Sequence, residues 1–216
     1  MNSIVIPHDY DYIGIYLTDT CHLACPYCIT RHHNSCFGSV RYHFLKPIEW
    51  IAGINRLVLP EGVPVTLQGG EPFLYPGIWE VLGNVRHKVD ILTALPPFLK
   101  KDHFLQLKTL EWNKRPAPYP TIRVSYHQGQ HDYKELVERI AELQDTVSIG
   151  LYYLDHPGMA QEIDALKKYA SRFGVELRKK EFLGIYNGER YGNYLYPEAA
   201  CGVRQGLIGK CKNTVG

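Results

Sequence analysis

Six short runs of apolar and β-branched residues recur along the chain, and this recurrence constrains the fold more than any other feature. Runs of this kind, bounded by turn-forming residues, predict β-strands. The predicted strands span residues 12–18, 63–67, 89–95, 121–126, 147–154 and 175–182. Helical patterns lie between them, and strands that alternate with helices form parallel sheets. The sequence therefore predicts an α/β fold, and periodicity alone leaves open whether the sheet is open or curled.

Five helices are predicted between the strands, over residues 47–59, 77–87, 98–110, 132–143 and 157–173. Pro47 suits the first turn of a helix, where its missing N–H has no partner to lose. Asp132 and Glu135 form a capping-box arrangement at the start of the fourth helix. A chain of 216 residues is long enough for one domain with a sizeable core.

Cys21, Cys25 and Cys28, the cysteine triplet, directly follow the first predicted strand. Thiolates from one short loop are the usual ligands of a 4Fe–4S cluster, and three of them leave the fourth iron open for chemistry. A zinc site would need a fourth ligand, for which His22 or His32 is a candidate. Disulfides would need a fourth cysteine, because three cysteines cannot all be paired. These alternatives stay open at this point, although neither needs the aromatic residue just before the last cysteine.

A second motif, with the sequence Gln-Gly-Gly-Glu-Pro, occupies residues 68–72 and follows the second predicted strand. In parallel α/β folds the working surface lies at the carboxyl ends of the strands, where both motifs fall. Two glycines let the backbone approach a ligand closely, so that neighbouring carbonyls can accept hydrogen bonds from an ammonium group. Taken alone, such a segment is more often a plain turn.

Together the two motifs resemble the radical S-adenosylmethionine (radical SAM) superfamily, in which three cysteines have this spacing and Tyr27 would be the aromatic residue of the signature. The resemblance implies a six-stranded partial (β/α)6 barrel with the cluster loop after the first strand. It implies that the cysteine triplet binds a 4Fe–4S cluster. It also implies that Gly69, Gly70 and Glu71 bind the methionyl amino group of S-adenosylmethionine.

Three further residues match positions of the same family. Tyr27 resembles the aromatic residue that flanks the adenine, and Ser125 resembles a hydroxyl placed against the ribose. Thr93, at the end of the third predicted strand, has a similar position in the family. Each has a plainer alternative, which is core filling for Tyr27, turn capping for Ser125 and simple strand propensity for Thr93. The glycine-rich adenine motif is poorly matched by residues 148–150, so nothing is inferred there.

The resemblance implies a reaction in which the reduced cluster cleaves S-adenosylmethionine to a 5′-deoxyadenosyl radical, which abstracts a hydrogen from the substrate. An electron donor such as a flavodoxin or ferredoxin is then expected. Peptide or protein modification is the expected role, with a peptide or small-molecule substrate. Arg178, Lys180, His127 and Tyr152 are candidates to recognise an acidic or peptide-like substrate. The alternative for these four is a solvated position at a strand end.

Other functions remain as alternatives. A glycyl-radical-enzyme activase or a modified-nucleobase synthase of the same superfamily would have a similar cluster core. From another class, the rival is a non-catalytic zinc-binding domain. The Gly-Gly-Glu-Pro segment favours the enzyme, because a zinc knuckle has no use for it. Cys36, within residues 30–44, is either an inert thiol or a hydrogen-atom donor to a substrate radical.

Charge and hydropathy exclude few classes of function. The formal net charge of +2 gives no strong field and does not favour a nucleic-acid partner. No apolar stretch approaches the roughly 20 residues that span a bilayer, so no membrane is expected. The first residues do not read as a secretory signal. The six cysteines are therefore interpreted as metal ligands or free thiols in a reducing cytoplasm.

We expect a radical SAM core domain over residues 1–184 and a C-terminal tail over residues 185–216. Residues 186–197 lack either periodicity and are predicted to form an ordered loop or lid. Cys201 and Cys211 resemble the start of an auxiliary-cluster region of the SPASM or twitch type, where they would bind a second cluster. Such a region needs more cysteines than remain, so the chain is expected to be a fragment of a longer enzyme unless these two thiols have another role.

Overall fold

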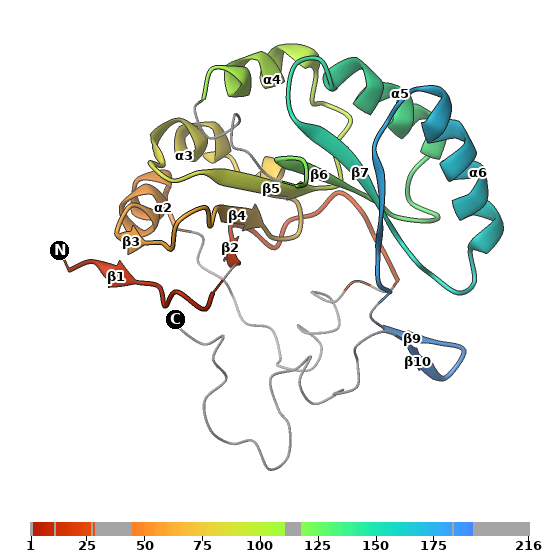
Figure 1. Ribbon diagram of the computed structural model, residues 1–216, viewed down its shortest axis with the longest axis horizontal. Helices are drawn as coiled ribbons and strands as arrows, with labels where there is room; N and C mark the ends of the chain where they lie inside the picture. The colour runs from red at the N-terminus through yellow and green to blue at the C-terminus, as the bar shows by residue number, and fades with distance from the viewer. Residues whose placement is uncertain are drawn as a thin grey trace.

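A computed structural model describes residues 2–10, 12–26, 28, 45–110, 118–182 and 184–191. Its main element is a parallel sheet of six strands in the order β2-β4-β5-β6-β7-β8 (Figure 1). These strands are β2 (Ile13–Tyr16), β4 (Val65–Gln68), β5 (Val89–Thr93), β6 (Ile122–Tyr126), β7 (Ile149–Leu154) and β8 (Leu177–Lys180). The spatial order follows the chain order, so all six predicted strands are confirmed, as is the partial barrel.

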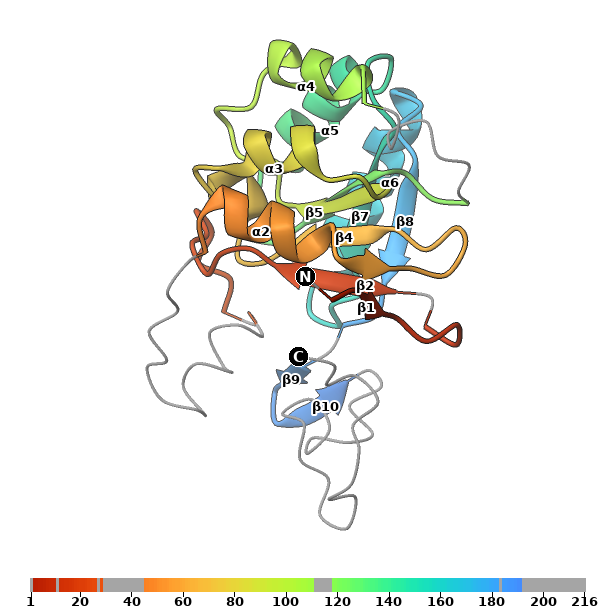
Figure 2. The same ribbon diagram turned by 90° about the vertical axis from the view of Figure 1, so that its left-hand side faces the viewer.

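The five predicted helices are confirmed, and they cover one face of the sheet (Figures 1 and 2). They are α2 (Pro47–Ile54), α3 (Ile78–Asn84), α4 (Lys101–Lys108), α5 (Tyr133–Leu143) and α6 (Ala160–Arg172). No described helix covers the opposite face. Within the described part of the chain, every helix is too short or too polar to cross a membrane.

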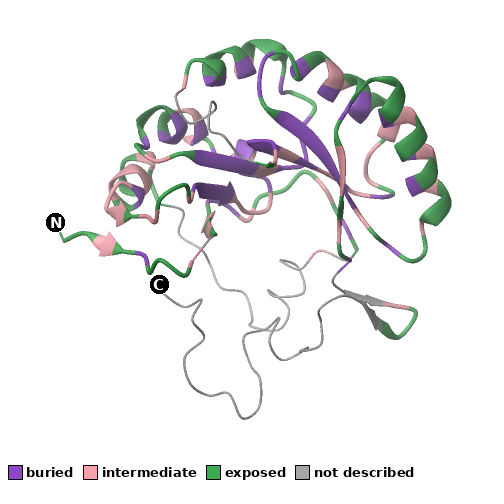
Figure 3. Cartoon of the chain, viewed as in Figure 1, coloured by how far each residue is buried: buried purple, intermediate pink, exposed green. Residues whose placement is uncertain are grey.

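Side-chain alternation along the strands separates an apolar face from a polar face. The apolar side chains pack against the helices and form the core. Figure 3 shows the buried residues along the strands and on the helices. The aliphatic core side chains from the sheet are Val65, Leu67, Val89, Ile91, Ile122, Val124, Ile149 and Leu151. The residues between them point the other way, toward what we call the inner face. Its main polar residues are Thr66, Asp90, Arg123, Ser125, Tyr152, Arg178 and Lys180.

Helix α2 ends earlier than the predicted end at residue 59. The side chain of Asn55 donates to the carbonyl oxygen of Asn84 (3.0 Å) and accepts from the N–H of Arg86 (2.8 Å), so α2 stops where it meets the end of α3. The chain then forms β3 (Leu57–Val58), which pairs in parallel with β1 (Ile4–Val5). The longer helix was a wrong prediction, because hydrophobic periodicity carries no information about this long-range pairing.

A β-hairpin occupies part of the segment that was predicted to be a loop or lid. Strands β9 (Gly184–Tyr186) and β10 (Glu189–Tyr191) pair in antiparallel fashion. Between them Asn187 and Gly188 have φ angles of 51° and 78°. Two consecutive positive φ angles match the two-residue turn that Asn-Gly favours in hairpins. The loop prediction was therefore wrong over residues 186–191, and this pair of residues was the signal it overlooked.

The N-terminal cap of α5 gives a first prediction. The side chain of Asp132 accepts from the N–H groups of Lys134 (2.8 Å) and Glu135 (3.4 Å). Asp132→Ala should therefore lower the free energy of unfolding by about 0.5–2 kcal/mol, the usual cost of losing such a cap. Glu142→Ala, at an exposed position of the same helix, is the matched control and should change it by less than about 0.5 kcal/mol. Urea denaturation measures both, and equal effects would contradict the role of the cap.

Candidate active site

The cysteine triplet lies in the loop that leaves β2 at the carboxyl end of the sheet. Cys25 is buried, Cys28 is partly buried and Cys21 is exposed. Within the loop the N–H of Leu23 donates to Cys21 Sγ (3.4 Å), and the N–H of Cys28 donates to the carbonyl oxygen of Cys25 (3.2 Å). Among the described residues, no three His, Cys, Asp or Glu side chains are gathered as metal ligands. The loop nevertheless supplies three thiols from one short segment, and this donor set fits an iron–sulfur cluster.

The Gly-Gly-Glu turn (residues 69–71) is hydrogen-bonded to the segment that enters the cysteine loop. The N–H of Gly70 donates to the carbonyl oxygen of Thr18 (2.7 Å), and the N–H of Glu71 donates to that of Thr20 (2.8 Å). A Cβ atom on Gly70 would lie 2.6 Å from the same Thr20 oxygen and 2.5 Å from that of Asp19. The backbone that Gly70 approaches closely is therefore the one leading into the first cysteine.

The Glu71 side chain is fully buried and joins two segments. Its Oε1 accepts from the N–H of Phe73 (3.1 Å) and from the hydroxyl of Thr93 (2.8 Å). Its Oε2 accepts from the N–H of Ala94 (2.6 Å). Burial raises the pKa of Glu71 to about 7, although all three hydrogen bonds oppose this by favouring the carboxylate. The side chain thus fastens the turn after β4 to the end of β5.

The loop after β5 is held in a strained conformation. Leu95 has a φ of 54°, which is rare for a residue with a large side chain. Its N–H donates to Thr93 Oγ1 (2.8 Å). The guanidinium of Arg139, on α5, donates to the carbonyl oxygens of Leu95 (2.9 Å) and Pro96 (2.8 Å). Such strain persists where its surroundings over-determine it. The Thr93 hydroxyl is engaged by Glu71 and Leu95, and its contact with the cofactor stays a prediction.

Three residues of the inner face meet at the ends of β6, β7 and β8. Ser125 and Tyr152 are paired in register, and Tyr152 is paired with Arg178. Lys180 Nζ donates to Ser125 Oγ (3.2 Å) and lies 5.0 Å from the centroid of the Tyr152 ring. Burial, and to a lesser extent the nearby Arg123, lowers the pKa of Lys180 to about 8. The structure therefore places Ser125 beside an ammonium group, and its contact with the ribose stays a prediction.

Arg123 occupies the middle of the inner face. Its Nη2 donates to Thr66 Oγ1 (3.2 Å) and to Asp90 Oδ2 (3.4 Å), and its guanidinium carbon lies 5.1 Å from the centroid of the Tyr119 ring. Asp90 is fully buried, so Arg123 compensates a charge that would otherwise be costly. The sequence analysis did not single out this pair. The sequence feature that could have indicated this pair is a charged residue inside each of two neighbouring predicted strands.

The loop after β6 contacts the cysteine loop. The side-chain Oε1 of Gln130 accepts from the N–H of Ala24 (2.9 Å), between the first two cysteines. In the same loop the N–H of His127 donates to His131 Nδ1 (3.1 Å). Burial, reinforced by Lys180, lowers the pKa of His127 to about 4, and burial and His127 lower that of His131 to about 4. Both rings are therefore neutral near pH 7. Gln130 was missed, because a single glutamine in a loop gives no signal.

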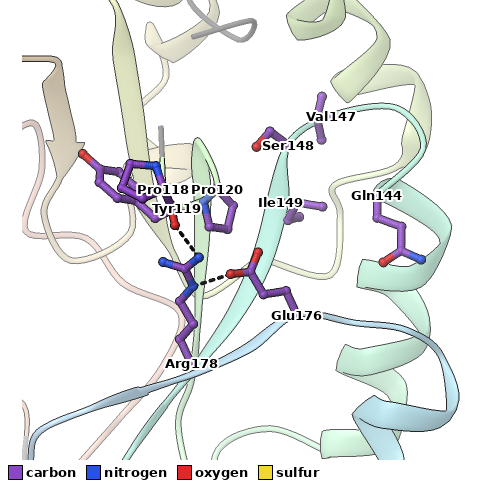
Figure 4. Close-up of a pocket in the computed structure, with 9 residues that line it drawn as sticks. All are labelled: Pro118, Tyr119, Pro120, Gln144, Val147, Ser148, Ile149, Glu176 and Arg178. Carbon is purple, nitrogen blue, oxygen red and sulfur yellow. Dashed lines mark hydrogen bonds and ion pairs between the residues drawn. The ribbon is translucent and has the colours of Figure 1, made fainter. Parts of the chain in front are cut away.

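A cavity of about 300 Å³ opens at the opposite end of the sheet (Figure 4). It is lined by residues at the amino ends of β6, β7 and β8, among them Pro118, Glu176 and Arg178. Arg178 forms an ion pair with Glu176 and donates to the carbonyl oxygen of Pro118. The cavity therefore lies away from the cysteine loop, and Arg178 belongs both to it and to the inner face.

The structure brings most of the predicted site residues to the carboxyl end of the sheet. The Gly-Gly-Glu turn is hydrogen-bonded to Thr93 and to the segment that leads into the cysteine triplet, and Ser125 lies on the inner face. Tyr27, Cys36, Cys201 and Cys211 lie outside the described residues. Their predicted roles stay predictions.

Comparison with known proteins gives two findings. The model of the Radical SAM superfamily matches residues 15–177 of the chain. Two curated relatives, both GTP 3′,8-cyclases, come from Clostridium perfringens strains SM101 and 13 and are each 32% identical over 78 residues. These matches cover 36% of this chain and 23% of each relative, so the similarity concerns less than a quarter of the cyclases.

The close approach at Gly70 gives a second prediction. Gly70→Ala should lower the free energy of unfolding by about 1–3 kcal/mol, because the added methyl group would press against two backbone carbonyls. Gly83→Ala, in α3, is the matched control, since a Cβ there meets open space. It should leave stability unchanged or raise it by up to about 1 kcal/mol. Urea denaturation of both variants decides the matter, and two stabilised proteins would show that the loops do not touch at Gly70.

The buried carboxyl of Glu71 gives a third prediction. Its pKa in the folded state is raised to about 7 from 4.5, so the folded protein binds more protons than the unfolded chain between these values. The stability that it contributes is complete below pH 4.5 and is lost as the pH rises through 7. Relative to Glu71→Gln, the wild type should gain free energy of unfolding as the pH falls through this window. A difference between the two proteins that does not change with pH would contradict this expectation.

Proposed function

Because the chain belongs to the radical SAM superfamily, it is an enzyme of that class, and we propose that Cys21, Cys25 and Cys28 hold its 4Fe–4S cluster. S-adenosylmethionine would bind beside the cluster at the carboxyl end of the sheet. The observation that carries this proposal is the pair of hydrogen bonds between the Gly-Gly-Glu turn and the segment entering the cysteine loop. They hold side by side the two motifs that the resemblance assigns to cluster and cofactor.

The chain's own residues would bind and orient the cofactor. When bound, the cluster and S-adenosylmethionine would supply a one-electron cleavage that forms a 5′-deoxyadenosyl radical, and this radical would take a hydrogen atom from the substrate. Gly69, Gly70 and Glu71 would receive the methionyl amino group through backbone carbonyls, because the Glu71 carboxylate already accepts three hydrogen bonds. Tyr27 would flank the adenine, and Ser125 would contact the ribose.

Thr93 would act on the cofactor indirectly. Its hydroxyl donates to Glu71 and accepts from Leu95, which leaves it little capacity for a further strong hydrogen bond. We therefore interpret Thr93 as a residue that positions the Gly-Gly-Glu turn.

The substrate would lie against the inner face, where the polar side chains of β6, β7 and β8 are gathered. Peptide or protein modification is the proposed role, and a flavodoxin or ferredoxin is the proposed electron donor. A nucleotide is the second candidate substrate. It is favoured by the cations Arg123, Arg178 and Lys180 on the inner face and by the name of the cyclases that resemble this chain.

A fourth prediction tests the cluster ligands. Anaerobic reconstitution should give about four irons per chain, the content of one cubane. Changing any one of Cys21, Cys25 and Cys28 to Ala should abolish formation of 5′-deoxyadenosine with dithionite, because a cubane held by two thiolates is labile. Cys36→Ala is the matched control and should retain its iron. Activity that survives in the triple variant, or a colourless protein that binds zinc, would contradict the proposal.

The same iron analysis tests the tail. Cys201 and Cys211 are proposed to belong to an auxiliary-cluster region, and two thiols are too few to hold a second cubane, so one is not expected here. A reproducible content of about eight irons, lost in the Cys201→Ala/Cys211→Ala double variant, would show that this chain already builds a second cluster.

A further inference from the structure

The inner face carries three cationic side chains, and they differ in their partners. Arg123 is paired with Asp90 (3.4 Å), and Arg178 is paired with Glu176. Lys180 has no carboxylate partner among the residues that the structure describes. In that part of the chain, its Nζ contacts a neutral hydroxyl and lies over an aromatic ring.

The surroundings of Lys180 favour an added negative charge. Among the described residues, the charged and titratable groups that face it are Arg123 from β6, Tyr152 from β7 and His127 from the loop after β6. Arg178 and Glu176 interact with Tyr152 and are paired with each other. None of the three groups that face Lys180 is a carboxylate. A partly buried ammonium group without a counter-charge is costly, and this cost disappears when an anion binds.

We propose that Lys180 and Tyr152 form a subsite that binds an anionic group of the substrate, either a carboxylate or a phosphate. Lys180 supplies the charge, and the Ser125 hydroxyl, which accepts a hydrogen bond from Lys180, holds this charge next to the position proposed for the ribose. The face of the Tyr152 ring keeps the ammonium group over β7. This inference rests on the proposed function, since it takes the inner face to be where the substrate lies.

The position of the subsite favours the substrate over the methionyl carboxylate of the cofactor as the source of the anion. The cysteine loop follows β2 and the Gly-Gly-Glu turn follows β4, whereas the Lys180 ammonium lies over β6 and β7. Neighbouring strands are about 4.8 Å apart, so the subsite is displaced from β4 by at least two strand spacings, on the order of 10 Å. A methionyl group held at the cluster would have to extend across β5 to reach it.

Competitive labelling with acetic anhydride, followed by mass spectrometry, tests the subsite in the reconstituted 216-residue protein. The reagent modifies the neutral amine, and a bound anion stabilises the ammonium form. Inorganic phosphate should therefore slow the labelling of Lys180 by about three- to tenfold near pH 8. Lys179 is the internal control, because it lies on the opposite face of β8 and is bonded to Asp155 (3.0 Å). Its labelling should not change. Equal labelling of Lys180 with and without phosphate would overturn the proposal.

A second measurement identifies the source of the anion. Lys180→Met should bind iron and S-adenosylmethionine as wild type does, with cofactor binding measured by equilibrium dialysis. Phosphate should protect the wild type against thermal unfolding, and Lys180→Met should lose this protection. Lys180→Arg should restore that protection, and Lys179→Met should behave as wild type. A drop in cofactor affinity of about tenfold or more in Lys180→Met would assign the anion to the cofactor and overturn the substrate subsite. Iron content tests the proposed function separately. A chain that binds no iron would contradict the proposed function, while the labelling of Lys180 could still be measured.

Discussion

The candidate site depends on one buried carboxylate. Glu71 accepts hydrogen bonds from the turn after β4 and from the end of β5, while its own N–H donates to the carbonyl oxygen of Thr20. One residue thus fixes the ends of three neighbouring strands relative to one another. A residue that the family resemblance assigns to cofactor binding also has a structural role. A lower cofactor affinity in a Glu71 variant is therefore informative only when the stability of that variant is known.

The two faces of the sheet have different roles, since one packs against the helices and the other carries polar side chains. On one face the buried aliphatic side chains pack against five helices, and each contributes about 1.5–3 kcal/mol by leaving water. The inner face carries polar groups that would be costly without partners. Arg123 and Asp90 satisfy each other there, and His127 and His131 stay neutral through burial. The apolar packing behind the sheet thus supports a polar surface in front of it.

The alternation of strands and helices predicted a parallel sheet with both motifs at the carboxyl ends of its strands. The sequential strand order of a partial barrel followed from the family resemblance. The sequence did not predict the pairing of β1 with β3, since two-residue strands have no periodicity. Nor did it show that the Glu71 carboxylate bonds Thr93, or that Gln130 contacts the cysteine loop. Those contacts join residues far apart in the chain and depend on how the loops are folded. Two signals were overlooked, which are the Asn187–Gly188 turn and the charged residues Asp90 and Arg123 inside neighbouring strands.

The two groups of candidate site residues come from different strands of the sheet. The cysteine loop and the Gly-Gly-Glu turn come from β2 and β4, whereas Ser125, Tyr152 and Lys180 come from β6, β7 and β8. Because spatial order follows chain order, the second group belongs to one contiguous stretch of the gene. Divergence or recombination in that stretch can alter the groups that line the inner face without touching the loops after β2 and β4. Relatives of this chain are accordingly expected to differ most in their last three strands.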